Sequence, residues 1–393
     1  MKHIQFLVLI LMLFAVAQSS GQTFDELEFG TDNTFEVVTW NIEWFPKDGQ
    51  TTVGYVSEII EALDVDLIAM QELDDTDAFD QMMASLDGYV GYYESGWFAG
   101  LAYIYKPDVL TINDIYEIYT TEEYWGAFPR SPMVMDLTFD GENIFVINNH
   151  YKCCGDGVLD YGNDSDEEYR RYRANELLKQ YIDVNLPDSK VIVLGDLNDI
   201  LTDAASNNVF QMILSDPDNY LFADLEIEQS GSSNWSYPSW PSHLDHILIT
   251  NELFEALDKD GSEISTIKVD EYFPGGWWGY DNAVSDHRPV AMRLDLSTTS
   301  NVDMIIPDVL RLSSHPNPFN PITTISYELP EDGFVNLKIF NSRGQQVDVL
   351  VNATITDGHH RAEWNATGFP GGTYYAKLSS GGLTTTHKIM LIK

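Results

Sequence analysis

The segment Phe35-Glu-Val-Val-Thr-Trp-Asn41 is an apolar strand pattern that ends in a polar residue, and the same design recurs along the chain. Val65-Asp-Leu-Ile-Ala-Met70 leads to Glu72, and Val191-Ile-Val-Leu194 leads through a glycine to Asp196. Short apolar runs bounded by polar residues are typical of buried strands. Because strand ends meet along one edge of a sheet, we expect the polar side chains that follow these runs to share a pocket.

Strand and helix patterns alternate from about residue 35 to residue 296. Residues 53–63 have helical apolar spacing, and residues 167–184 predict a second helix. Residues 133–139 and 143–148 are predicted to pair across an Asp-Gly turn, which favours a hairpin. Further strands are predicted at 100–105, 246–249 and 290–294. This mixture of hairpins and helices favours an α+β fold, with two β-sheets covered by helices.

The charge of the chain is strongly negative and unevenly distributed. The 393 residues carry a net charge of −41, yet the segment from Leu312 to Lys393 holds six acidic and six basic residues. This break in charge predicts a domain boundary near residue 312. An acidic surface repels polyanions and attracts cations. Two explanations stay open, namely a surface suited to salty surroundings and the recruitment of cations.

The first 21 residues are predicted to be a signal peptide. Lys2 and His3 precede a largely apolar stretch from Ile4 to Val16, and small or polar residues follow. Thirteen residues are too few to span a bilayer, and no other apolar run is long enough. We therefore expect an exported protein with no transmembrane segment after cleavage. Export permits oxidation of the adjacent Cys153 and Cys154, but a ring between neighbours is strained, so two free thiols are expected.

The C-terminal part has a different organisation. Residues 298–313 resemble a linker, and the helical patterns stop beyond it. Glycine and Asn-Ser turns separate short strands at 323–329, 335–340, 360–364, 373–378 and 385–392. The pattern predicts a small Ig-like β-sandwich over residues 314–393.

The residues at the predicted strand ends are suited to phosphodiester cleavage. Carboxylates and amides are hard oxygen ligands for Mg²⁺, and histidines move protons near neutral pH. Each residue alone has a simpler explanation, such as a turn cap for Asn41 or a structural role for either histidine. Their joint occurrence favours a site; the set is Asn41, Glu72, His150, Asp196, Asn198, Asp245, Asp286 and His287.

The motifs that hold these residues resemble those of the endonuclease/exonuclease/phosphatase superfamily, in the same order. They are Thr-Trp-Asn-Ile-Glu-Trp, Gln71-Glu72, Asn149-His150, Gly195-Asp-Leu-Asn198, Leu244-Asp-His-Ile-Leu and Ser285-Asp-His-Arg-Pro-Val. The resemblance covers roughly residues 35–295 and places a catalytic domain at 22–297. It implies a four-layered α/β sandwich with the active site between the two sheet edges.

The resemblance also implies roles. Glu72, with Asn41 and Asp286, would bind the metal, expected to be Mg²⁺ with Mn²⁺ or Ca²⁺ as alternatives. His287 would act as the general base or as a transition-state contact, with Asp245 orienting it. His150 would protonate the leaving oxygen. Asp196 and Asn198 would orient the nucleophile and the phosphate. Arg130 would lie near the scissile phosphate.

Three positions depart from the pancreatic-type members of that family. Ala99 stands where a Glu would partner His150, and Asp74 and approximately Trp97 replace residues that enter the DNA minor groove. Reading of duplex DNA in that manner is therefore not expected. Flanking aromatic loops at 235–240 and 272–280 suit either base stacking or ordinary packing. The acidic loop 156–168 is expected to be solvated, with a second bound cation as the alternative.

We therefore predict a secreted, metal-dependent phosphodiesterase, most simply a nuclease for extracellular DNA or RNA. The main alternative is a sphingomyelinase-like enzyme or another small-substrate phosphodiesterase or phosphatase. For a sphingomyelinase, Trp277-Trp278 is the one weak membrane-contact candidate. A catalytically dead binding module would not be expected to retain the whole set of residues.

The tail has its own resemblance. His315-Pro-Asn-Pro-Phe-Asn-Pro-Ile-Thr-Thr-Ile, Gly344-Gln-Gln-Val and the last six residues resemble the C-terminal sorting domain of the type IX secretion system. A structural or carbohydrate-binding β-sandwich is the alternative. The resemblance implies delivery to the medium or the outer-membrane surface and the secretion machinery as a partner. The protein is expected to be a monomer that binds a nucleic acid substrate.

Overall fold

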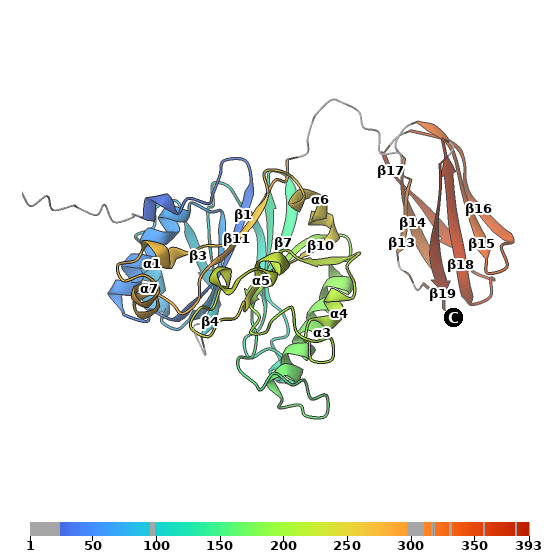
Figure 1. Cartoon of the computed structure of the whole chain (residues 1–393). Coiled ribbons are helices and arrows are strands. Elements are labelled where there is room, and N and C mark those ends of the chain that lie inside the picture. Colours follow the sequence, from blue (N-terminus) through green and yellow to red (C-terminus); the bar gives the residue numbers. More distant parts are fainter. Residues whose placement is uncertain are drawn as a thin grey trace, which may run out of the picture. The chain divides into compact units, whose positions relative to one another are not determined.

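The computed structural model describes residues 24–94, 99–297 and 310–392, apart from 316, 318, 330, 331, 357 and 382. The chain divides into two compact units, Met1–Thr298 and Thr299–Lys393 (Figure 1). The predicted signal peptide and most of the predicted linker lie outside the described residues. In the described residues no helix is both long enough and apolar enough to cross a membrane.

Two six-stranded sheets form the centre of the first unit. In spatial order, sheet A contains β11 (Glu263–Thr266), β12 (Val290–Leu294), β1 (Phe35–Phe45), β2 (Leu67–Leu73), β4 (Gly100–Tyr105) and β3 (Val90–Tyr93). Sheet B contains β5 (Thr111–Glu117), β6 (Met133–Phe139), β7 (Glu142–His150), β8 (Lys190–Asp196), β10 (Asp245–Thr250) and β9 (Tyr220–Phe222).

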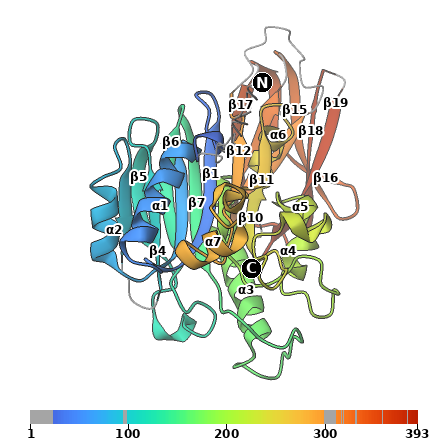
Figure 2. The same ribbon diagram turned by 60° about the vertical axis from the view of Figure 1, so that its left-hand side comes forward.

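Helices cover the outer face of each sheet. The α-helices are α1 (Gln50–Leu63), α2 (Thr76–Met83), α3 (Glu167–Asn185), α4 (Gln211–Leu214), α5 (Leu225–Gln229), α6 (Phe254–Leu257) and α7 (Trp277–Ala283). Short 3-10 turns occur at Phe24–Glu26, Glu122–Tyr124, Ser232–Asn234, Asn251–Leu253 and Val269–Tyr272. Side chains of α1, α2 and α7 pack on sheet A, and those of α3 and α4 pack on sheet B. Figure 1 shows the two helical layers on opposite sides of the sheets, and Figure 2 gives a turned view. The predicted four-layered sandwich is confirmed.

Alternation along the strands explains how the two sheets pack and why one end of their interface is polar. Phe35 and Val37 of β1 point between the sheets, whereas Val38 and Trp40 point to the helices. Successive side chains of a strand face opposite ways, so the inward series of β1 continues through Thr39 to Asn41. The apolar layer between the sheets therefore gives way to polar groups where the strands end.

Hydrogen bonds tie the two sheets together beneath these polar ends. Gln71 Nε2 donates to Asn148 Oδ1 (2.8 Å) across the interface, and Asn148 Nδ2 donates to the carbonyls of Met70 and Ala102, both at 3.0 Å. The Tyr103 hydroxyl lies 2.8 Å from the carbonyl oxygens of Met133 and Val146. All the side chains of this network are buried, so its bonds fix the spacing of the sheets just below the pocket.

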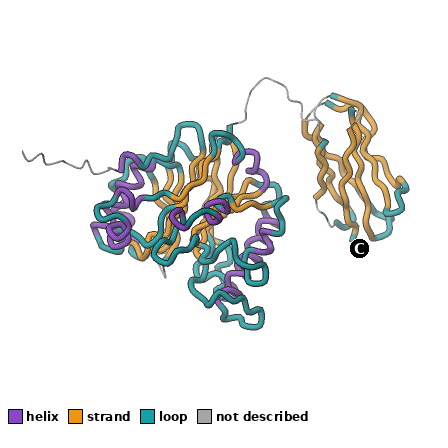
Figure 3. The backbone as a smooth tube through the Cα atoms, viewed as in Figure 1, coloured by secondary structure: helices purple, strands orange, loops and turns teal. Residues whose placement is uncertain are grey.

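The second unit contains antiparallel strands, as Figure 3 shows by the absence of helix colour in its described residues. One sheet contains β13 (Arg311–His315), β14 (Ile322–Leu329) and β17 (Gly358–Asn365). The other contains β16 (Gln346–Ile355), β15 (Gly333–Asn341), β18 (Gly372–Ser380) and β19 (Leu383–Leu391). Trp364 and Phe319 lie in the core between them. The predicted β-sandwich is confirmed, although β13 begins inside the segment interpreted as linker.

Candidate active site

A pocket of about 390 Å³ opens where the polar strand ends of the two sheets meet. Of the predicted site residues, it is lined by Glu72, His150, Asp196, Asn198, Asp286 and His287. Asp245 and Asn41 are buried directly behind these residues. The structure therefore places these strand-end side chains in or directly behind one pocket, as we expected from the sequence.

The strand register brings three of these residues into one row. His150 of β7 pairs with Asp196 of β8 in parallel, and Asp196 pairs with Asp245 of β10 in antiparallel. Paired residues on neighbouring strands point to the same face of a sheet. The imidazole of His150 and the carboxylates of Asp196 and Asp245 therefore lie side by side at the end of the layer between the two sheets.

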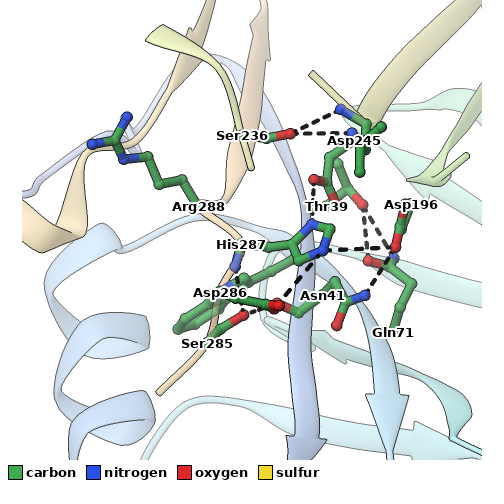
Figure 4. Close-up of polar contacts among 12 residues, drawn as sticks. Thr39, Asn41, Gln71, Asp196, Ser236, Asp245, Ser285, Asp286, His287 and Arg288 are labelled. Atoms are coloured by element: carbon green, nitrogen blue, oxygen red, sulfur yellow. Dashed lines mark hydrogen bonds and ion pairs between the residues drawn. The ribbon is translucent and has the colours of Figure 1, made fainter. Parts of the chain in front are cut away.

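His287 faces this row from the other sheet, just before β12 (Figure 4). Its Nδ1 lies 2.7 Å from Asp245 Oδ2, while its Nε2 lies 3.9 Å from carboxylate oxygens of Asp196 and Asp286. Burial alone would lower the pKa of His287, but the carboxylates of Asp245 and Asp196 outweigh it and raise the pKa to about 10. The ring is thus held with Nε2 towards the pocket.

Serine side chains from two loops hold the His287–Asp245 pair in place. The backbone N–H of Asp245 donates to the Ser236 hydroxyl at 3.2 Å. The Ser285 hydroxyl donates to the carbonyl of Asn41 (2.6 Å) and accepts from the N–H of His287 (2.9 Å). Ser285 therefore couples the end of β1 to the segment that carries the imidazole, which Figure 4 shows.

Asn41 joins carboxylates from both sheets. Its Nδ2 donates to Asp196 Oδ2 at 2.9 Å and to Glu72 Oε1 at 3.1 Å, while its Oδ1 accepts from the N–H of Glu43. With this amide orientation Asn41 clamps the two carboxylates. Its role as a direct metal ligand stays a prediction.

A bulge in β2 turns Glu72 into the pocket. The pairing of β2 with β4 shifts register between Gln71 and Leu73, and Glu72 has a positive φ of 67°. In a regular strand Glu72 would face the helices, because Gln71 already faces the other sheet. Asn198, Glu43 and Trp44 also have positive φ values, of 55°, 41° and 51°. Strained backbone of this kind gathers at functional sites, where it re-aims side chains.

His150 is fully buried and incompletely paired. Its Nε2 lies 3.6 Å from Asp196 Oδ2 and 3.8 Å from Glu72 Oε1, and its Nδ1 has no hydrogen-bond partner in the described part of the chain. Burial, together with the charges of Arg130 and His287, lowers the pKa of His150. Ala99 stands where pancreatic-type members have a Glu. It is buried, and as an alanine it supplies no carboxylate to His150.

Arg130 lies beside the main pocket and does not line it. It lines a neighbouring cavity of about 220 Å³ with Trp125 and Glu117. Burial lowers the pKa of Arg130, while the charges of Glu72 and Asp196 act in the opposite direction. Its charge therefore acts on the site, although the predicted phosphate contact stays a prediction.

The donor set suits a divalent cation. Glu43, Glu72, Asp196 and Asp286 all line the pocket. Burial, with the charges of Asp245 and Glu72 adding to it, raises the pKa of Asp196 to about 7 against the pull of His287 and Asn41. Asp245 Oδ1 is buried and has no hydrogen-bond partner among the residues that the structure describes. A site with this excess of carboxylate oxygens would be stabilised by a hard cation.

Glu43 and Trp44 line the pocket but were given no role by sequence reasoning, whereas Tyr237 and Trp240 belong to the aromatic loop 235–240 that was predicted to flank the last motifs. Glu43 accepts from the N–H of Asp286 at 2.9 Å and forms an ion pair with Lys47. Its position two residues after Asn41, in the same motif, was an available signal. Tyr237 lies against His287 with ring centroids 4.8 Å apart.

The aromatic loops combine packing and exposure. Trp235 donates to the carbonyl of Glu228 and Tyr280 is buried, but Trp240 is 78% exposed at the pocket rim. Cys153 and Cys154, which also line the rim, are free thiols. Asp74 is exposed, and Trp97 lies outside the described residues.

Solved structures with a similar arrangement share little sequence with this chain. D. rerio TDP2 complexed with single strand DNA product is 15% identical, over 67% of this chain and 99% of that chain, with a TM-score of 0.49. The endonuclease/exonuclease/phosphatase from Bacteroides vulgatus is 15% identical, over 67% and 99%, with a TM-score of 0.46. The human Nocturnin catalytic domain is 17% identical, over 66% and 94%, with a TM-score of 0.47. No inference about substrate follows at this level of similarity.

Family models account for both units, whereas no curated protein matches the chain significantly. Residues 313–393 match the secretion system C-terminal sorting domain, here of type IX, so the protein is destined for the medium or the outer-membrane surface. Residues 38–287 match the endonuclease/exonuclease/phosphatase model, which spans the pocket and both sheets. The chain belongs to the endonuclease/exonuclease/phosphatase family.

Proposed function

We propose that the protein is a metal-dependent phosphodiesterase, and specifically a nuclease that hydrolyses extracellular DNA or RNA. The observation that carries this proposal is the convergence of the His287–Asp245 pair with Asp196, Asn41 and Glu72 around one pocket. An enzyme of this kind must activate water, neutralise charge on phosphate and stabilise a leaving oxygen. The pocket holds a group suited to each task.

His287 is the proton-transfer group in this proposal. Asp245 at Nδ1 fixes the tautomer, so that Nε2 exchanges the proton with a nucleophilic water. Charge neutralisation on the phosphate is the chemistry that a divalent cation supplies when Glu72, with Asn41 and Asp286, holds it. The positive charge of the cation would then offset part of the carboxylate charge that raises the pKa of His287. A smaller rise in this pKa would favour the neutral, base form of the imidazole.

Asp196 and Asn198 position the reacting groups. Asp196 Oδ1 accepts a hydrogen bond from the N–H of Asn198 at 3.0 Å, and Asp196 Oδ2 accepts one from the side chain of Asn41. Asn198 itself lines the pocket wall. The lowered pKa of His150 keeps its ring neutral at neutral pH. A neutral His150 can donate one hydrogen bond to a phosphate or leaving oxygen.

Two exposed indoles support a nucleic acid as the substrate. Trp44 and Trp240 both line the pocket and are 52% and 78% exposed. Flat aromatic faces beside a phosphate site stack on bases without reading sequence, at about 1–3 kcal/mol per base. The net charge of −41 disfavours long duplexes, so single strands and short substrates suit this pocket better.

A lipid phosphodiesterase is the second candidate. Trp278, in helix α7, is 69% exposed, as a membrane contact would require. Its neighbour Trp277 instead donates to the Ser239 hydroxyl and lies against the guanidinium of Arg288. Only one of the two indoles is therefore available for lipid contact.

The mature protein should be incubated with Mg²⁺ and separately with plasmid, single-stranded DNA, RNA and sphingomyelin. We expect cleavage of nucleic acid, with single strands cut faster than duplex. The variant Trp240→Ala should raise KM for single strands with little change for a small chromogenic diester. Cleavage of sphingomyelin alone would refute the nuclease assignment and favour the lipid enzyme.

A further inference from the structure

We propose a second cation site, distinct from the catalytic pocket, in the loop that precedes helix α3, and we assign Ca²⁺ to it. Asp156, Asp166 and Glu168 each offer a carboxylate oxygen there, and these oxygens lie within 4.8 Å of one another. Asp156 comes from the loop, Asp166 is the N-cap of α3, and Glu168 is in its first turn. Three oxygens at this separation can face one ion.

The strongest indication of a bound cation is that the carboxylate of Glu168 is buried and incompletely paired. Its side chain is only 3% exposed, although a buried carboxylate is costly unless its oxygens are paired. Oε1 accepts from the N–H of Gly157 at 2.7 Å and lies 3.3 Å from Arg171 Nη2. Oε2 is buried and has no hydrogen-bond partner among the described residues. Glu168 therefore keeps one oxygen without a hydrogen bond while it offers a carboxylate oxygen to the cluster.

The charges around Glu168 do not balance. Arg171 is the guanidinium that contacts it, but Arg171 also pairs with Asp199 at 2.8 Å and is itself buried. Within the residues that the structure describes, no basic side chain forms an ion pair with Asp156 or Asp166. One positive charge therefore faces four carboxylates, and a divalent ion would offset the excess.

The chemistry of the ligands favours Ca²⁺ over other ions. All three side-chain ligands are hard oxygens, which excludes a preference for soft metals. Ca²⁺ accepts six to eight oxygens in irregular geometry, and loop carbonyls and water can complete its shell, whereas Mg²⁺ demands a near-ideal octahedron. Secreted proteins meet Ca²⁺ at concentrations that suit weak, partly exposed sites.

The site is linked to the wall of the catalytic pocket. Arg171 Nη1 donates to the carbonyls of Lys152 (2.8 Å) and Cys154 (2.7 Å). Cys153 and Cys154 line the pocket, and Asp199, the other partner of Arg171, directly follows Asn198. A cation on Glu168 would fix Arg171 and, through it, this wall. Ca²⁺ would thus stabilise the protein without taking part in catalysis.

Calorimetric titration of the EDTA-treated, full mature protein with Ca²⁺ tests the site. The test variant is Asp156→Asn, because Asp156 is exposed and the amide oxygen can still accept the N–H of Val158. The matched control is Asp164→Asn, an exposed residue of the same loop outside the cluster. We expect Asp156→Asn to weaken Ca²⁺ binding by roughly tenfold or more through loss of a charged ligand, and Asp164→Asn to bind as the wild type does.

A second comparison separates this site from the catalytic one. In the Glu72→Gln background, Ca²⁺ should still bind and raise Tm, and adding Asp156→Asn should abolish both effects. Glu168→Gln should reproduce the loss if it folds, as judged by circular dichroism. Equal Ca²⁺ affinities for Asp156→Asn and Asp164→Asn, or no Ca²⁺ binding in the Glu72→Gln background, would overturn the proposal. Neither result would bear on phosphodiester cleavage.

Discussion

The two histidines of the pocket differ in how firmly their neighbours hold them. Asp245 fixes Nδ1 of His287, which therefore keeps one tautomer and a raised pKa. His150 has no such partner on Nδ1 within the described residues, and its pKa is lowered. We therefore assign proton transfer to His287 and hydrogen-bond donation to His150.

Replacement of His287 by alanine should lower kcat by roughly 10² to 10⁴, the range for loss of a positioned proton-transfer group. His150→Ala should also reduce the rate, by no more than His287→Ala does. Steady-state kinetics on a short single-stranded substrate provides the measurement. Circular dichroism must show that both variants are folded. Near-full activity of folded His287→Ala would exclude the assigned role.

Glu72→Gln should weaken binding of Mg²⁺ at the catalytic pocket, because an amide replaces a charged oxygen ligand of similar size. The loss should appear as a higher Mg²⁺ concentration at half-maximal rate, about tenfold or more. Glu123→Gln is a suitable control, since Glu123 is an exposed glutamate outside the pocket. Identical Mg²⁺ dependence of the two variants would show that Glu72 is not a ligand.

At the scale of elements, the close approach of β7 and β8 explains the glycine before Asp196. Gly195 has a φ of 147°, and a Cβ there would lie 1.9 Å from the carbonyl oxygen of Asn149. The Asn149-His150 and Gly195-Asp196 segments therefore pack backbone to backbone. This contact brings His150 and Asp196 together.

Gly195→Ala should destabilise the protein by about 1–3 kcal/mol, because the added methyl forces the strands apart. It should also lower activity, since His150 and Asp196 would move. The control is Gly54→Ala in α1, where a Cβ meets nothing within 4 Å and the free energy of unfolding should rise slightly. Chemical denaturation measures both. Equal stabilities of the two variants would refute the close-contact explanation.

His246, which follows Asp245 in β10, belongs to a buried network. Asp224 Oδ2 lies 3.1 Å from His243 Nε2 and 2.6 Å from His246 Nδ1, while His246 Nε2 faces the carbonyl of Asp199 at 2.8 Å. Both ring nitrogens of His246 thus face acceptors, as an imidazolium requires. Burial opposes the charge, but Asp224 outweighs it and raises the pKa of His246 to about 9.

This pKa shift makes stability depend on pH. A raised folded-state pKa gives a stabilisation that is complete below the ordinary value of 6.5 and is lost as pH rises through about 9. Tm should therefore fall between pH 6.5 and 9.5. His246→Gln should lower Tm at pH 6 and flatten the decline, because the buried pair with Asp224 is gone. An unchanged slope in that variant would contradict the charged state of His246.

The sequence predicted the interior strands well and the edges less well. β1, β2, β7, β8 and β10 carry apolar runs, and their register follows from alternation. β5, whose side chains are mostly exposed, and β16, whose side chains are exposed or half-buried, were missed. The positions of Glu43, Trp44 and Glu72 depend on positive φ values and on the β2 bulge. Such turns arise from tertiary packing and leave no periodic signal.

At the scale of the whole molecule, the two units have separate cores and separate charge. The strongly acidic unit carries the pocket, and the nearly neutral unit carries the sorting domain. We expect residues 22–297 to fold and to retain catalysis, because that unit has core clusters of its own.

Expression of residues 22–297 alone should give a soluble protein with the kcat/KM of the mature full-length chain. Loss of activity in this fragment, with the full-length chain active, would mean that the units are interdependent. In the producing cell, deletion of 314–393 should retain the enzyme inside the outer membrane, as immunoblots of cell fractions would report. Normal surface delivery of the truncated chain would contradict a sorting role.

The central claim is that the pocket at the sheet ends hydrolyses phosphodiesters with the help of a divalent cation. The most direct test is the rate of cleavage of a single-stranded oligonucleotide by the mature protein, first in EDTA and then with Mg²⁺ restored. We predict no turnover in EDTA and full recovery with Mg²⁺, whereas folded His287→Ala should recover only to a rate lower by roughly 10² to 10⁴. Undiminished turnover in EDTA would contradict the account.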